Sequence, residues 1–186
     1  MTTFTGVIAG TGIAASRLAF VQIMQARKIE RIRHLLSLVN DFERDPMLAY
    51  RKGAGRKRLD REAYPSERQE LLNFFEMVAM LVRRKYLDPH DVWDCFSYWM
   101  FYVYADFRGE IEQIQRQDAC YFRDFCKLID RLRRIEEQEG GKDDRPWSEE
   151  IKEFWENETK AAEGQPIKKR SPATTREASR SRMNRI

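Results

Sequence analysis

The chain has 186 residues, enough for one domain with appendages, and its long runs of Leu, Arg, Glu and Ala with only 9 Gly and 6 Pro favour an all-helical protein. The net charge of +4 comes from two segments: residues 46–66 carry 6 Lys/Arg against 2 Asp/Glu and residues 164–186 carry 7 against 1, whereas residues 67–163 carry 15 against 23. The basic charge therefore does not by itself indicate a nucleic-acid-binding protein, and no period-2 alternation or Asn-Gly turn predicts strands.

The N-terminal segment, residues 1–45, is predicted to form one long helix. Residues 4–24 are about long enough to cross a hydrocarbon core, and Arg27 and Lys28 follow where basic residues flank the cytoplasmic end of a spanning helix. Arg17 lies near the middle of this stretch, where it would cost about 2.5–3.5 kcal/mol on insertion. Two interpretations stay open: a single membrane-spanning anchor, or the first turns of an amphipathic helix that packs on a partner helix as in a coiled coil.

Residues 46–66 form a basic connector with at most a short helix of its own. Asp45-Pro46 should end the preceding helix, because the residue before a proline disfavours the helical conformation. The sequence GAGRKR at residues 53–58 has no preceding strand and no Lys-Ser/Thr ending, so it is not a phosphate-binding P-loop. The connector still concentrates five candidate anion-binding cations: Arg51, Lys52, Arg56, Lys57 and Arg58.

Residues 67–163 are predicted to form the helical core, in which two strongly apolar helices meet at Leu87-Asp88. Asp88 is a good N-cap for the second helix, and Pro89 suits its first position because the missing N–H has no partner there. The first helix is expected to run to about Tyr86 and to be buried on most sides, and the second is aromatic nearly all round as far as Phe107.

The second half of the core is predicted to contain one more long helix and one short helix. Gly109 is expected to break or kink the aromatic helix, and a seven-residue repeat of apolar residues continues from there to Gly140. A last short helix is expected to begin at Ser148, with Phe154 and Trp155 as its anchors. The elements together predict an all-α bundle of four to five helices with a long N-terminal helix.

The C-terminal tail, residues 164–186, has almost no large apolar residue and is expected to be disordered. Its basic residues Lys168, Lys169 and Arg170 are a second candidate for anion binding.

Three stretches of the sequence carry a resemblance to a known family. They are VNDFERDPMLAYRKGAGRKRL at residues 39–59, LLNFFEMVAMLVRRKYLDPHDVWDCFSYWMFYVY at 71–104, and IEQIQRQDACYFRDFCKLIDRL at 111–132. The order of these stretches resembles a bacterial family of unknown function whose short helical members usually have one N-terminal membrane helix. The resemblance covers roughly residues 5–135 and implies a helical module without an activity to transfer. The chain departs from the family at Arg17 and the glycines near it.

Few residues point to catalysis or metal binding. His34 and His90 lie on different segments without a metal-ligand spacing, so no metal or other cofactor is predicted. Glu76 is the one carboxylate expected inside the core; we interpret it as the partner of Arg83 or another arginine, with a functional acid as the alternative.

The chain has three cysteines, Cys95, Cys120 and Cys126. An odd number of thiols without C-x-x-C spacing indicates a reducing compartment.

The sequence therefore predicts a non-enzymatic helical interaction or scaffold module on the cytoplasmic side. If residues 4–24 span the membrane, this module belongs to a single-pass inner membrane protein. Its expected partners are another protein or a second copy of the chain, because the aromatic helix 89–107 exceeds what a small bundle buries; an anionic membrane surface is a further candidate. The alternative is a non-specific nucleic-acid-binding protein that uses residues 51–58 and 168–185.

Overall fold

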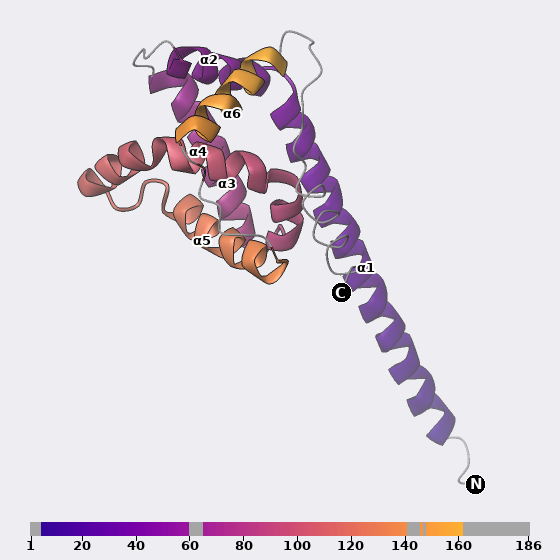
Figure 1. Cartoon of the computed structure of the whole chain (residues 1–186). Coiled ribbons are helices and arrows are strands. Elements are labelled where there is room, and N and C mark those ends of the chain that lie inside the picture. The colour runs from indigo at the N-terminus through magenta and orange to yellow at the C-terminus, as the bar shows by residue number, and fades with distance from the viewer. Residues whose placement is uncertain (1–4, 60–64, 141–145, 147, 162–186) are drawn as a thin grey trace, which may run out of the picture.

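The computed structural model describes residues 5–59, 65–140, 146 and 148–161, with backbone only for 5–18, 57, 59, 65 and 161 (Figure 1). Every regular element in these residues is a helix. The all-α prediction is therefore confirmed, with six helices in this part of the chain where four to five were expected. The helices are α1 Thr5–Glu43, α2 Met47–Leu59, α3 Pro65–Arg83, α4 Pro89–Gln117, α5 Arg123–Gln138 and α6 Ser148–Ala161. The tail predicted to be disordered, residues 164–186, lies outside the described residues.

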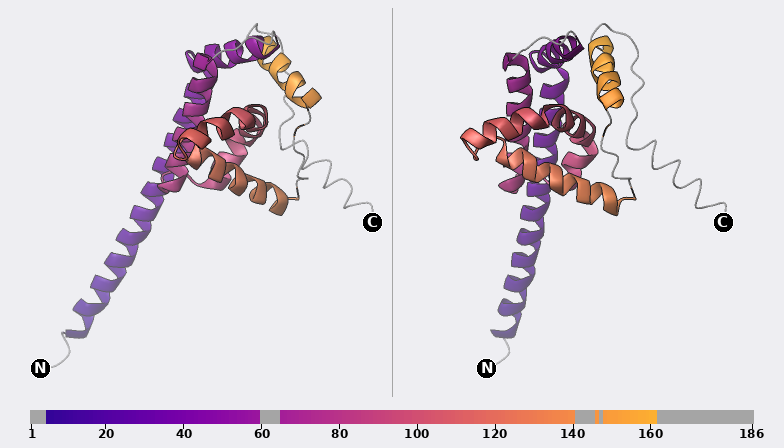
Figure 2. Two further views of the ribbon diagram at one scale, coloured as in Figure 1. Left: turned by 90° about the vertical axis from the view of Figure 1, so that its left-hand side faces the viewer. Right: turned by 60° about the vertical axis from the view of Figure 1, so that its left-hand side comes forward.

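Helix α1 is a long rod that joins the body of the protein only near its C-terminal end (Figure 1, Figure 2). Leu35, Leu38 and Phe42 are buried there, whereas residues 19–34 are all exposed. Within the described residues, no helix combines the length and the apolar character that a membrane crossing requires. This finding argues against the membrane-spanning anchor, which was one of the two interpretations of residues 4–24.

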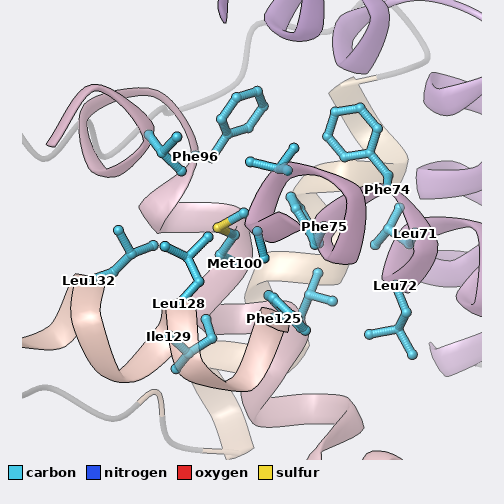
Figure 3. Close-up of a cluster of buried hydrophobic side chains, with 14 of the residues drawn as sticks. Leu71, Leu72, Phe74, Phe75, Phe96, Met100, Phe125, Leu128, Ile129 and Leu132 are labelled. Carbon is cyan, nitrogen blue, oxygen red and sulfur yellow. The ribbon is translucent and has the colours of Figure 1, made fainter. Parts of the chain in front are cut away.

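The helix pair α3–α4 forms as predicted around the Asp88-Pro89 start signal. Asp88 Oδ1 accepts a hydrogen bond from the backbone N–H of His90 at 2.9 Å, and Pro89 occupies the first turn. Side chains from α3, α4 and α5 meet in one apolar cluster, where the ring of Phe75 stacks on that of Phe125 at 5.6 Å (Figure 3). This cluster is the centre of the core, as the apolar pattern predicted.

The expected break at Gly109 is wrong, because α4 continues through it to Gln117. Phe107 and Ile111 on either side are each 1% exposed, so their burial outweighs the cost of a glycine inside a helix. The chain turns instead at residues 118–122, where the carboxylate of Asp118 accepts from the N–H of Cys120 at 2.9 Å. Phe122 is buried in a left-handed conformation (φ 51°), and α5 then runs back against α3 and α4.

A second layer is formed by α2 and α6, which pack closely against each other at Gly55. A Cβ atom at Gly55 would lie 3.0 Å from Thr159 Cγ2 and 3.2 Å from the carbonyl oxygen of Trp155, so only glycine fits without a shift. Trp155 is fully buried, and its indole N–H donates to Asp106 Oδ2 on α4 at 2.9 Å. The two glycines of GAGRKR therefore serve helix packing.

A buried ion pair between Arg51 of α2 and Glu158 of α6 joins this layer to the rest of the body. Arg51 Nε donates to Glu158 Oε2 at 2.8 Å, and a guanidinium NH donates to the Phe42 carbonyl oxygen at the end of α1 at 3.1 Å. The indole N–H of Trp99 on α4 donates to the other carboxylate oxygen at 3.0 Å. Four helices thus contribute to one polar cluster inside the protein.

The close approach at Gly55 predicts opposite effects for two glycine substitutions. Gly55→Ala should lower the free energy of unfolding by about 1–3 kcal/mol, because the new methyl group meets backbone atoms of α6. Gly109→Ala is the matched control: no atom lies within 4 Å of its Cβ position, so it should raise the free energy of unfolding by about 0.5–1 kcal/mol. Urea denaturation measures both, and an unchanged stability for Gly55→Ala would contradict the packing of α2 on α6.

Removal of one member of the buried ion pair should be costly. Glu158→Ala leaves the Arg51 cation buried without its carboxylate, and we expect the free energy of unfolding to fall by about 3–5 kcal/mol. Glu156→Ala on the same helix removes a more exposed carboxylate 3.8 Å from Lys152 and should change it by less than about 1 kcal/mol. If urea denaturation showed an equally small change in the free energy of unfolding for both substitutions, α6 would not be part of the cooperative fold.

Candidate functional site

The exposed apolar side chains of the protein concentrate on α1. Of the ten large hydrophobic residues that are exposed in the described part of the chain, seven lie between residues 20 and 36. They are Phe20, Val21, Ile23, Met24, Ile29, Ile32 and Leu36, and we call them the α1 patch. The other three, Met77, Tyr86 and Tyr121, are scattered over the body. At 3.6 residues per turn, the residues of the α1 patch lie on more than one side of the helix: Phe20 and Met24 share the side of the buried Leu35, whereas Ile29 lies nearly opposite. A concentration of exposed apolar residues on a projecting helix is typical of an interaction surface.

The geometry of an α-helix shows how two residues of this patch, Phe20 and Met24, lie relative to the buried part of α1. Met24 lies eleven residues, or about three turns, before the buried Leu35, and Phe20 lies about five turns before the buried Leu38. Both therefore lie on the core-facing side of α1, where they line a groove beside the start of α4 without being buried. Their side chains are 51% and 64% exposed, although their positions on the helix match those of core residues.

Basic side chains accompany the apolar patch on the same helix. Arg27, Lys28, Arg31 and Arg33 follow one another within two turns, with Glu30 as the one acid among them. Arg33 donates to Glu30 at 3.2 Å, an exposed pair within the helix that contributes little to stability. The exposed part of α1 therefore combines an apolar surface with an excess of positive charge.

Two grooves lie beside α1 where it passes the turn between α3 and α4. The first, of about 640 Å³, is lined by Phe20, Val21 and Met24 on one side and by Asp88 and Asp91 on the other. The second, of about 650 Å³, is lined mainly by basic residues of α1 and of the end of α3; these are Arg27, Arg31, His34, Arg84 and Lys85. The sequence did not predict either groove, because each combines residues more than fifty positions apart.

Glu76, the candidate acid, is half-buried and bonded to the backbone rather than to an arginine. Its carboxylate accepts hydrogen bonds from the N–H groups of Asp124 at 3.2 Å and of Phe125 at 2.7 Å, at the start of α5. A carboxylate at this position satisfies helix-terminal N–H groups and suits the positive end of the helix dipole. Arg83, the partner that we expected, donates instead to Asp124 at 2.7 Å.

The connector cations do not come together as one exposed cluster. Arg51 is 5% exposed and holds Glu158, and Arg58 Nε donates to the buried carboxylate of Asp106 at 2.7 and 3.0 Å. Lys52 is half-buried and Arg56 is exposed, whereas the side chain of Lys57 lies outside what the structure describes. The tail residues of the anion-binding prediction, Lys168, Lys169 and Arg170, also lie outside the described residues.

The described residues offer no assembled catalytic or metal centre. Among them, no three His, Cys, Asp or Glu side chains are grouped closely enough to hold a metal ion. Burial raises the pKa of the Cys95 and Cys126 thiols, which keeps them in the poorly nucleophilic protonated form. His90 lies exposed at the start of α4, and His34 lines the basic groove.

The fold thus defines an all-helical module with a projecting helix, and a family comparison assigns most of its residues to a known family. Residues 5–132 match the model of a domain of unknown function, DUF4760, so the chain belongs to this family. The resemblance predicted from the sequence is confirmed at this level, whereas a bacterial source and an N-terminal membrane helix do not follow from the match. Neither curated proteins nor solved structures gave a match. Helix α6 lies outside the matched residues, although it completes the core.

Proposed function

We propose that the protein is a non-enzymatic helical interaction module that associates with a second copy of itself through α1. The observation that carries this proposal is the α1 patch, which places most of the exposed large apolar side chains of the described residues on one projecting helix. Burial of such side chains is the main favourable term in protein association. An interaction role also fits the arrangement of Glu76, which accepts backbone N–H groups of α5, and of Cys126, which contacts Gln115.

The aromatic helix 89–107, which we first expected to mediate self-association, is covered within the chain. Tyr102 stacks on Phe154 of α6 at 4.8 Å, and Tyr104 contacts Phe125 of α5 at 5.8 Å. None of its large apolar residues is exposed in the structure. The exposed apolar surface left for a partner is therefore on α1, where no other described element covers it.

The length of the patch supports a second copy as its occupant. The patch extends over 17 residues, or about 25 Å of helix. Two such helices side by side would bury on the order of 1,000 Å² in total, at the lower limit of a specific interface. The same patch on both copies satisfies two-fold symmetry, which is the commonest arrangement of homodimers. We therefore expect a dimer that forms at micromolar concentration.

One observation favours this function over nucleic-acid binding, and the effect of salt distinguishes the two. Two of the candidate anion-binding cations in residues 51–58 are engaged within the protein: Arg51 is buried, and Arg58 is bonded to Asp106. Like charges on the two α1 helices, Arg27, Lys28 and Arg31, would repel each other in the dimer, so salt should strengthen association by screening them. Binding to nucleic acid has the opposite dependence, because salt weakens it steeply.

Light scattering across a concentration series tests this proposal. The wild-type chain should change from monomer to dimer between about 1 and 100 µM, in the range of small interfaces. The double variant Phe20→Ser/Met24→Ser should remain monomeric over this range, because it removes two of the exposed anchors. The control Met77→Ser/Tyr121→Ser also removes two exposed apolar side chains, but from the body, and should dimerise as the wild type does.

Two results would refute the proposal. One is a wild-type protein that stays monomeric throughout the series at both low and high salt. The other is a dimer that forms equally well in all three proteins, since its interface would then lie elsewhere.

A further inference from the structure

The basic groove between α1 and the end of α3 is a separate feature that the interaction role does not use. Arg27, Arg31 and His34 reach it from successive turns of α1, and Arg84 and Lys85 reach it from the residues that follow α3. Leu81 and Tyr86 add an apolar side chain and an aromatic ring. The groove has a volume of about 650 Å³, within the range of sites for small organic ligands.

Its cations have no acidic partner within the part of the chain that the structure describes. No ion pair or side-chain hydrogen bond joins Arg27, Arg31, Arg84 or Lys85 to an acid among the described residues. Glu30, the one acid on the lining, accepts from Arg33 at 3.2 Å. Four positive charges around the groove raise the local concentration of anions. The planar guanidinium group of an arginine can also donate two parallel hydrogen bonds to the oxygens of one phosphate.

The turn after α3, which carries Arg84 and Lys85, has a backbone fixed by hydrogen bonds. The N–H of Lys85 donates to the Val82 carbonyl at 3.0 Å, and the N–H of Tyr86 donates to the Leu81 carbonyl at 2.9 Å. Lys85 itself has a left-handed conformation with φ 64°. Glycine is the usual residue at such a helix end, because a side chain there is strained. A lysine in this position gives up stability and directs a charge from a rigid turn, as strained residues at binding sites do.

We propose that this groove binds an organic phosphate of nucleotide size. The phosphates would lie between the arginines of α1 and the Arg84-Lys85 pair, and the apolar part of the ligand would lie on Leu81 and the exposed ring of Tyr86. All lining residues of the site come from one copy of the chain, so the monomer contains the complete site.

Calorimetric titration of the full chain at 150 mM salt, with ATP, inorganic triphosphate and a polyglutamate peptide as probes, tests this site. ATP should bind at least tenfold more tightly than triphosphate, because only ATP has a ring for Tyr86. Arg31→Gln/Arg84→Gln should weaken ATP binding at least tenfold, because it removes one cation from each side of the groove. Arg108→Gln/Arg116→Gln is the control, since it removes the same charge from exposed positions on α4 and should leave ATP binding unchanged.

Lys85→Gly separates loss of binding from loss of folding. Glycine relieves the left-handed strain, so the thermal midpoint should rise while ATP binds more weakly. Titration of Phe20→Ser/Met24→Ser, whose residues line the other groove, should give the wild-type affinity for ATP and so distinguishes this site from the α1 patch.

Three results would overturn the nucleotide site. The first is the absence of ATP binding at millimolar concentration. The second is an equal loss of affinity in the groove variant and the α4 control, which would indicate a general charge effect. The third is binding of triphosphate or polyglutamate as tight as that of ATP, which would assign the groove to an anion without a ring or to an acidic peptide.

Discussion

The buried ion pair between Arg51 and Glu158 is the interaction on which the arrangement of the helices depends. Two charges inside a protein cost several kcal/mol unless their remaining hydrogen bonds are made, and here the Phe42 carbonyl and the Trp99 indole make them. The Arg51 guanidinium also lies 4.4 Å from the centre of the Phe42 ring. The pair therefore requires α1, α2, α4 and α6 to meet at one point, and it holds α1 by its C-terminal end.

Attachment at one end gives α1 its functional character. Near its C-terminal end the helix is part of the core, through Leu35, Leu38 and Phe42, whereas the residues before Leu35 carry apolar and basic side chains that stay exposed beside the body. The basic residues of this exposed part then face either solvent or the turn after α3, which creates the groove around Arg84 and Lys85. Both proposed roles, association and anion binding, follow from the position in which the buried pair holds this helix.

The sequence predicted those features whose causes are local. The Asp88-Pro89 start of α4 was found because capping depends on adjacent residues, and the anchors of α6 were found because a short amphipathic helix has one apolar side. The turn after Gln117 was missed, because it depends on the burial of Phe122 rather than on a glycine. Arg51 was taken for an anion-binding residue because its partner Glu158 lies 107 positions away. The basic groove was missed for the same reason, since periodicity within a helix does not reveal which helices meet.

Hydrogen–deuterium exchange along α1 at low and high protein concentration tests the central claim most directly. Residues 35–43 should be protected equally at both concentrations, because they are held in the core of each copy. Residues 19–34 should exchange rapidly at low concentration and become protected at high concentration, as the second copy covers them. Exchange of residues 19–34 that does not depend on concentration would contradict the account, and so would rapid exchange of residues 35–43.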